Sequence, residues 1–210
     1  MRGIEGDQEW TSRIWFSDEA HFALNSAVNR RSNVYWGQNK TTEVSQMPLH
    51  SPKVTVWCAM SSNMVIGPFF FEDGQGNTVT VNQENYRSVL VKFVASLRRR
   101  QVDLDNAWFQ QDGATPHAAI ETLRRLQQVF GDRVISRRTN HPWSPHSPDL
   151  NPLDFFLWGY MKNRVYENTP ATIMELKEEI KRVLKTVTQT MCRNTIQNFE
   201  KRVKLCHNYF

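Results

Sequence analysis

The sequence predicts an α/β domain with a mixed central sheet, flanking helices and a C-terminal helical tail. Three observations favour this class: β-type runs near the N-terminus, a strand, helix and strand in the middle, and helical patterns beyond residue 151. With 210 residues and 40% hydrophobic content, the chain can bury one sizeable core. We expect an N-terminal tail at 1–12, a core at 13–168, and C-terminal helices packed on that core at 169–210.

The N-terminal part contains short runs rich in β-branched and aromatic residues, separated by polar residues. These runs span residues 13–22, 33–36, 54–60 and 65–72. Because such residues suit a half-buried pleated surface, the runs predict a meander of antiparallel strands. Apolar residues at helical spacing then predict one helix after the meander: Tyr86, Val89, Leu90, Phe93 and Leu97.

The middle of the chain predicts a strand at 106–112, a helix that Gly131 stops, and a short strand at 133–138. Either Thr115 or Pro116 is expected to begin that helix, since proline suits a first helical turn. This part of the chain therefore predicts a strand, a helix and a second strand.

A proline-rich stretch at 141–152 leads into the C-terminal helices. Its four prolines predict a stiff connection, because proline fixes a backbone angle and removes a hydrogen-bond donor. Asn151 and Pro152 provide an N-cap and a first helical position, and Thr169 with Pro170 repeats this pattern. The last helix is expected to place a stripe of residues inward: Cys192, Ile196, Phe199, Val203, Cys206 and Phe210.

Composition narrows the function classes. A net charge of +5 and a pI near 9.2 suit a polyanionic partner, but many ordinary proteins carry such an excess. Cys58, Cys192 and Cys206 are widely separated, so they indicate small core residues rather than a disulfide framework or a zinc module. No apolar stretch is long enough to cross a membrane, and no secretory signal is recognisable. We expect an intracellular protein without membrane association.

Three carboxylates are candidates for a shared site, because a mixed α/β order can bring distant strands side by side. Asp18 lies in the first predicted strand, where aspartate is uncommon; an exposed strand face is the alternative. Asp112 precedes Gly113, a pair that also suits a plain turn. Asp154 occupies the third position of its helix, where it can instead cap Asn151.

Two neighbouring acids are weaker candidates. Asp149 lies beside Pro148 in the proline-rich stretch, which favours a turn. Glu19 directly follows Asp18, so on a strand it should face the opposite side of the sheet.

Three blocks, WFSDEAHF, WFQQDGATPH and HSPDLNPLDFFLWGYMK, resemble the acidic blocks of mariner-type transposases in the Tc-mariner superfamily. They occur in the family's order, and the resemblance runs from about residue 10 to the end of the chain. It implies an RNase H-like catalytic core whose triad is Asp18, Asp112 and Asp154, the last matching the acid after Asn-Pro-Leu. The 41 residues between Asp112 and Asp154 are more than is common in the family.

The resemblance implies metal-dependent DNA strand cleavage and strand transfer, with Asp18, Asp112 and Asp154 holding two Mg²⁺ or Mn²⁺ ions. Such ions activate one oxygen and stabilise the leaving oxygen, and they prefer oxygen ligands. Gly113 and Ala114 would keep the backbone low beside Asp112, so that DNA can approach. Because like charges repel, metal should raise the melting temperature, and Asp112→Asn should blunt that rise and stabilise the metal-free protein.

The resemblance also implies DNA partners, namely transposon ends and target, together with a homodimer and a nuclear location. His117 is an auxiliary candidate that contacts a phosphate or holds the Asp112 loop, and plain surface is its alternative. Trp143 and Trp158 could stack on a displaced base, although core packing is commoner for tryptophan. Basic side chains near the acidic blocks are candidates for DNA-backbone contacts: Arg124, Arg125, Arg137, Arg138, Lys162 and Arg164.

A rival hypothesis comes from a different class. Members of this family usually carry N-terminal helix-turn-helix readers, and none fits in the residues before Asp18. The alternative function is therefore an inactive or domesticated transposon-derived module that binds nucleic acid. An RNase H-type nuclease acting on RNA–DNA hybrids fits the metals but not the extended third block.

Overall fold

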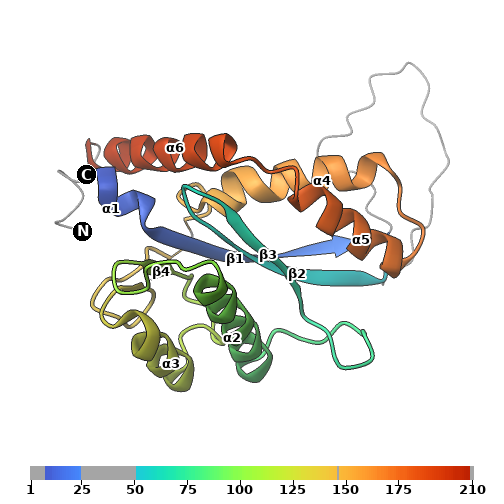
Figure 1. Ribbon diagram of the computed structural model, residues 1–210, viewed down its shortest axis with the longest axis horizontal. Coiled ribbons are helices and arrows are strands. Elements are labelled where there is room, and N and C mark those ends of the chain that lie inside the picture. The colour runs from blue at the N-terminus through green and yellow to red at the C-terminus, as the bar shows by residue number, and fades with distance from the viewer. Residues whose placement is uncertain (1–7, 25–50, 146, 209–210) are drawn as a thin grey trace, which may run out of the picture.

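The computed structural model describes residues 8–24, 51–145 and 147–208. The strands are β1 (Ile14–Ala23), β2 (Lys53–Met60), β3 (Val65–Phe70), β4 (Trp108–Gln110) and β5 (Val134–Ile135). The helices are α1 (Gln8–Ser12), α2 (Gln83–Arg99), α3 (Ile120–Phe130), η1 (Leu153–Leu157), α4 (Trp158–Glu167), α5 (Ile173–Leu184) and α6 (Gln189–Asn208). Helices lie on both sides of one five-stranded sheet (Figure 1).

β1 lies at the centre of a mixed sheet with the strand order β3-β2-β1-β4-β5. It pairs antiparallel with β2 and parallel with β4, while β3 and β5 extend the two sides. The predicted mixed sheet is confirmed, and the run at 33–36 lies outside the described residues. The parallel pairing aligns Phe16 with Gln110, so Asp18 and Asp112 occupy corresponding positions two residues further along.

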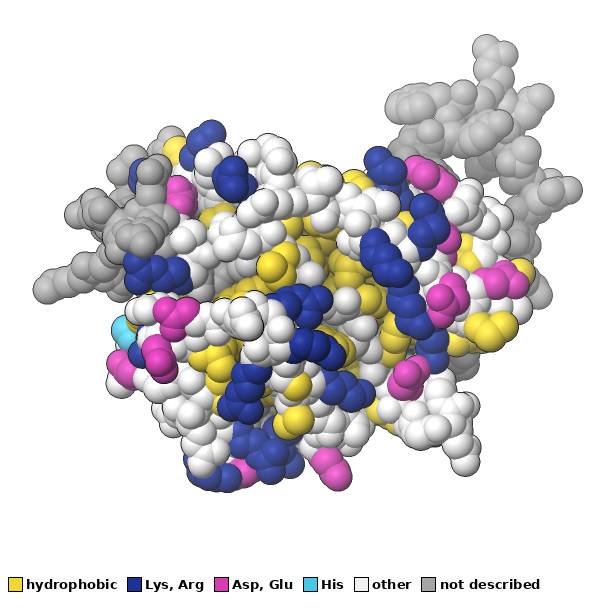
Figure 2. Space-filling view, in the orientation of Figure 1, with side chains coloured by type: hydrophobic (Ala, Val, Ile, Leu, Met, Phe, Trp, Pro, Cys, Tyr) yellow, Lys and Arg dark blue, Asp and Glu magenta, His cyan; other side chains and the backbone are white. Residues whose placement is uncertain are grey.

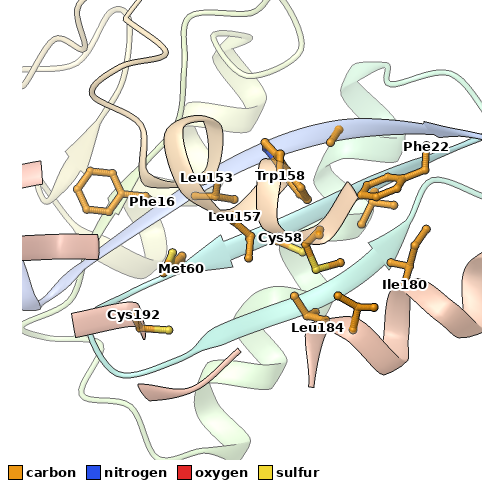
Figure 3. Packing of buried hydrophobic residues seen from close by; sticks show 14 of the residues in the cluster. Phe16, Phe22, Cys58, Met60, Leu153, Leu157, Trp158, Ile180, Leu184 and Cys192 are labelled. Carbon is orange, nitrogen blue, oxygen red and sulfur yellow. The ribbon is translucent and has the colours of Figure 1, made fainter. Parts of the chain in front are cut away.

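One face of the sheet packs against η1, α4, α5 and α6. Figure 3 shows the centre of this layer, which is formed by Phe16, Phe22, Cys58, Met60, Leu153, Leu157, Trp158, Ile180, Leu184 and Cys192. Each of these side chains is less than 10% exposed. Because burying one large apolar side chain contributes roughly 1.5–3 kcal/mol, this layer anchors the helical segment that carries Asp154.

The opposite face packs against α2 and α3. The apolar face predicted for α2 is buried here, and Phe93 packs edge-on against Trp57 with ring centroids 5.1 Å apart. From α3, Phe130 stacks on Phe109 of β4 at 5.6 Å. The Phe130 contact fixes the C-terminal end of α3 against β4.

Two helices start later than the sequence patterns predict. α3 begins at Ile120 rather than at Thr115 or Pro116, because residues 114–118 form a separate turn around the Ala114 carbonyl. This turn positions the residues that follow Asp112.

α5 is capped by Thr172 rather than by Thr169 and Pro170. Thr172 Oγ1 accepts the Glu175 backbone N–H at 3.1 Å, and Glu175 Oε2 accepts the Ala171 N–H at 2.8 Å. Two N–H groups at the helix start are satisfied reciprocally in this way, as in a capping box.

The inward stripe of α6 is confirmed for Cys192, Ile196 and Phe199, which are all less than 5% exposed. Cys206 is exposed and was wrongly expected in the core, because the last turns of α6 extend past the buried cluster. Phe210 lies outside the described residues.

The segment expected as an N-terminal tail contains α1, which lies beside α6 (Figure 1). Trp10 of α1 packs edge-on against Trp108 of β4, with ring centroids 5.3 Å apart. The division of the chain at 13 and 169 stays a prediction. Among the described residues, no helix is long and apolar enough to cross a membrane.

A carboxylate pocket as the candidate active site

Asp18, Asp112 and Asp154 line one open pocket of about 730 Å³. They come from the middle of β1, the loop that follows β4 and the helical segment η1. The other described lining residues are Glu19, Gly113, Ala114, Arg137, Trp143, Ser144, Pro145, Ser147, Pro148 and Asn151. The pocket therefore gathers all three acids of the predicted triad, whereas the exposed Asp149 is not part of its described lining.

Asp18 is largely enclosed and is held by a tryptophan. Trp158, which is 5% exposed, donates its Nε1–H to Asp18 Oδ2 at 2.7 Å. Burial, together with the charges of Asp154 and Glu19, raises the pKa of Asp18 to about 8, although the Trp158 bond opposes the rise. Trp158 thus packs in the core, as tryptophan usually does, and also orients an acid of the pocket.

Asp154 lies in a wide, π-helical turn, a geometry that often occurs at functional sites. Asn151 acts as the predicted cap, because its Oδ1 accepts the Leu153 N–H at 3.1 Å. The N–H of Asn151 bonds to the Pro148 carbonyl, so it does not need Asp154 as a partner. Burial and the charge of Asp112 raise the pKa of Asp154.

Asp112 occupies a tight turn that also forms part of the pocket wall. Its Oδ1 accepts the Ala114 N–H at 2.9 Å and a hydrogen bond from His117. Burial raises the pKa of Asp112, but the hydrogen bond and charge of His117 outweigh this effect and lower it. A Cβ at Gly113 would lie only 3.1 Å from Arg137 Cδ, so glycine permits close packing here. The plain turn and the pocket wall are one feature.

His117 is 4% exposed, which excludes the surface alternative. Its Nδ1 contacts Asp112 Oδ1, and its Nε2 lies 3.1 Å from Glu19 Oε1. Ionised carboxylates only accept hydrogen bonds, so both bonds require a proton on each ring nitrogen. Burial lowers the pKa of His117, but the charge of Glu19 and hydrogen bonds to both acids raise it to about 10.

The fold is similar to solved structures of Mos1 transposase. A pre-cleavage Mos1 transpososome superposes with a TM-score of 0.76 at 20% identity, covering 95% of this chain and 56% of that chain. The crystal structure of the Mos1 mariner catalytic domain gives a TM-score of 0.69 at 18% identity, covering 95% and 82%. The chain has the fold of a mariner transposase catalytic domain. The predicted RNase H-like α/β class is thereby confirmed.

Sequence similarity extends to a curated human protein. Over 142 residues, 64% of this chain, it is 28% identical to the Homo sapiens histone-lysine N-methyltransferase SETMAR. The matched part is 19% of that protein, and this chain spans little more than half of the Mos1 chain in the transpososome. No family model matches the sequence. The resemblance to mariner transposases therefore concerns the catalytic-domain fold.

The carboxylate oxygens of the pocket are suitable ligands for hard divalent cations. The Mos1 catalytic domain has been solved with Mg and with Mn. In the described parts of this chain, no three Asp, Glu, His or Cys side chains are grouped closely enough to hold one ion. Carboxylate oxygens are nevertheless the ligands that such ions prefer, and the raised pKa values of Asp18 and Asp154 show that negative charge is unfavourable there. The pocket fits a cation by its chemistry and requires its acids to move closer.

The basic residues predicted to contact DNA have different surroundings. Arg137 lines the acidic pocket, and the charge of Lys162 opposes the rise in the pKa of Asp154. Arg124 and Arg125 both pair with Glu121, at 2.8 and 2.9 Å, which reduces their free charge. Only Arg137 of the six lies in the pocket lining.

The other two predicted contacts lie outside that lining. Arg138 is exposed, and the Arg164 guanidinium lies over the Tyr160 ring, 5.0 Å from its centroid. Figure 2 shows further Lys and Arg side chains gathered over α2 and α5 on one face of the molecule. The basic surface is therefore wider than the residues predicted from the acidic blocks.

Sequence reasoning missed three side chains that support the acids: Glu19, Trp158 as an Asp18 partner, and Gln111. Gln111 Oε1 accepts from the Tyr86 hydroxyl at 2.8 Å, and its Nε2 donates to the His117 carbonyl at 2.9 Å. Alternation along β1 correctly placed Glu19 on the face opposite Asp18. The presence of His117 on that face depends on tertiary packing, for which the sequence carries no local signal.

Proposed function

We propose that this chain is the catalytic domain of a DNA transposase and performs metal-dependent strand cleavage and strand transfer. The observation that carries the proposal is that Asp18, Asp112 and Asp154, distant in sequence, line one pocket on a mariner transposase fold. A set of carboxylates suits phosphodiester chemistry, because it can hold hard divalent cations beside the phosphate that reacts.

Asp18, Asp112 and Asp154 are the proposed ligands of two Mg²⁺ or Mn²⁺ ions. When bound, such ions activate the attacking oxygen and stabilise the leaving oxygen. Trp158 holds Asp18 through Oδ2, and the Ala114 N–H holds Asp112 through Oδ1, so Asp112 keeps its Oδ2 for a cation. The repulsion that raises the pKa of Asp18 and Asp154 would be relieved as the acids close around the ions.

DNA is the proposed substrate, as transposon ends and as target. Arg137 shares the pocket with the acids and would bind a phosphate, while the low turn at Gly113 and Ala114 leaves room for the DNA backbone. Solved relatives include a Mos1 paired-end complex with the left transposon end, which supports this substrate class.

The other basic residues named above, Arg124, Arg125, Arg138, Lys162 and Arg164, are proposed contacts to the DNA backbone. We also propose a homodimer and a nuclear location, both of which rest on the resemblance to mariner transposases.

The proposal is tested by a cleavage assay on supercoiled and linear DNA with and without Mn²⁺. The unsubstituted protein should nick or cut DNA only with the metal, and Asp112→Asn and Asp154→Asn should each abolish cleavage. Asp149→Asn is the matched control, because this exposed aspartate lies five residues before Asp154 and outside the pocket lining.

Three outcomes would contradict the proposal or its choice of acids. Cleavage that survives both pocket substitutions would show that another site performs it. No metal-dependent cleavage by a folded, DNA-binding protein would favour the inactive or domesticated binding module instead. Loss of cleavage in Asp149→Asn with retention in Asp154→Asn would mean that the third acid was wrongly chosen.

A further inference from the structure

A buried imidazole connects two acids from different parts of the chain, Asp112 after β4 and Glu19 in β1. His117 contacts Asp112 Oδ1 through Nδ1 and Glu19 Oε1 through Nε2 at 3.1 Å. Glu19 is adjacent to Asp18 on β1, but strand alternation turns it away from Trp158, the partner of Asp18. Two consecutive acids therefore have different partners, and only Glu19 reaches His117.

The surroundings of His117 hold it in one position. The Tyr86 ring lies against the imidazole, with centroids 4.0 Å apart and planes inclined by 32°. Gln111 Nε2 donates to the His117 carbonyl at 2.9 Å and to Ser136 Oγ at 3.0 Å. Tyr86 and Gln111 are both fully buried, so the imidazole has little freedom to rotate or shift.

The bonds to Asp112 leave part of its carboxylate available. The Ala114 N–H and His117 both meet Oδ1, so the group is held at one oxygen and keeps the lone pairs of Oδ2 for a ligand. Asp112 lies in the loop after β4 rather than inside a strand, so its side chain depends on such contacts for a fixed direction.

We propose that Glu19 is a positioning residue that acts through His117 to hold Asp112 in the direction needed to bind a metal ion. This inference rests on the proposed function, since it concerns a ligand of that site. Glu19 anchors the imidazole from the opposite side, and the imidazole in turn fixes Asp112. Partners of this kind commonly change metal affinity by about 10–100-fold.

The test is a double-mutant cycle with Glu19→Gln, His117→Ala and the two combined. Mn²⁺ affinity is measured by calorimetry and by the metal-induced shift of the melting temperature. Each single substitution should weaken Mn²⁺ binding by about tenfold, and the combined variant should bind no more weakly than His117→Ala. A direct electrostatic effect of Glu19 on the ion would persist without His117, so the cycle separates the two explanations.

Two further readouts distinguish positioning from general damage. In cleavage assays of Glu19→Gln, the maximal rate should fall while the half-saturating DNA concentration stays unchanged. The matched control is His141→Ala, which removes another histidine paired with a carboxylate, Asp132, outside the described pocket lining. This control should retain the Mn²⁺ affinity of the unsubstituted protein.

The outcomes separate this inference from the proposed function. If the unsubstituted protein neither binds Mn²⁺ nor cleaves DNA, the proposed function fails and the inference with it. If it does both, but Glu19→Gln keeps full Mn²⁺ affinity, or weakens it equally with and without His117, the positioning role is refuted. Glu19→Gln preserves shape, so full Mn²⁺ affinity in this variant refutes the positioning role even if His117→Ala fails to fold.

Discussion

Replacing Asp18 by asparagine should stabilise the metal-free protein. Burial and the neighbouring charges of Asp154 and Glu19 raise the pKa of Asp18 from 3.8 to about 8. Asparagine removes the charge while its Oδ1 can still accept the Trp158 N–H that Asp18 Oδ2 accepts at 2.7 Å. The substitution therefore removes the cost of protonating Asp18 on folding and keeps the hydrogen bond.

The magnitude follows from the difference in pKa between the unfolded and folded chains. The folded protein binds the Asp18 proton more tightly, so stability is retained at low pH and falls as the pH rises between 3.8 and about 8. Each pH unit in this window costs about 1.4 kcal/mol, which gives up to about 4 kcal/mol at pH 7. For a chain of this size, Asp18→Asn should raise the melting temperature at pH 7 by up to about 8–16 °C.

Thermal unfolding at about pH 5 and about pH 7 measures this effect. The gain should shrink to about 1–2 kcal/mol at the lower pH, and Mn²⁺ should stabilise the unsubstituted protein more than Asp18→Asn. Asp149→Asn, at an exposed position, should change neither value. An unchanged or lower melting temperature for Asp18→Asn at pH 7, with no dependence on pH, would refute the reasoning.

In the structure, Asp18 rather than Asp112 is the acid whose replacement by asparagine should stabilise the metal-free protein. The sequence led us to expect that Asp112→Asn would stabilise the metal-free protein. However, the bond and charge of His117 lower the pKa of Asp112, so its charge is favourable in the folded state. The unfavourable charge lies on Asp18 and Asp154 instead.

Three further predictions concern supporting contacts. Trp158→Phe removes the hydrogen bond to Asp18, which contributes roughly 1–3 kcal/mol to stability. The melting temperature measured by calorimetry should therefore fall by about 2–12 °C. An unchanged melting temperature would show that this hydrogen bond does not stabilise the fold. Thr172→Ala removes the α5 cap and should cost about 1 kcal/mol in urea unfolding, whereas Thr169→Ala should be neutral. Arg137→Ala should weaken DNA binding and reduce its salt slope by about 1, measured by anisotropy at several salt concentrations; tight binding that is insensitive to salt would contradict this.

In the described residues, the sequence by itself determined the type and order of the strands and of the helices beyond β3, but not α1, which lies where a tail was expected. Hydrophobic periodicity is a local property, so the buried face of α2 and the strand around 54–60 could be predicted. Helix starts were less certain, because Thr169 and Thr172 both satisfy local capping rules. Thr172 is the cap in the structure, where Leu176 in the next turn is fully buried.

Only the tertiary structure decided which acids meet and what holds each of them. Asp18 and Asp112 come together because β1 and β4 pair in parallel with a defined register. The partner of Asp18 lies 140 positions away in the chain, and the His117 partner of Glu19 lies 98 positions away. Local patterns specify which direction a side chain faces along its own strand or helix. Local patterns carry no information about which distant residue packs against that side of the strand or helix. This distant partner determines the orientation and the pKa of each acid.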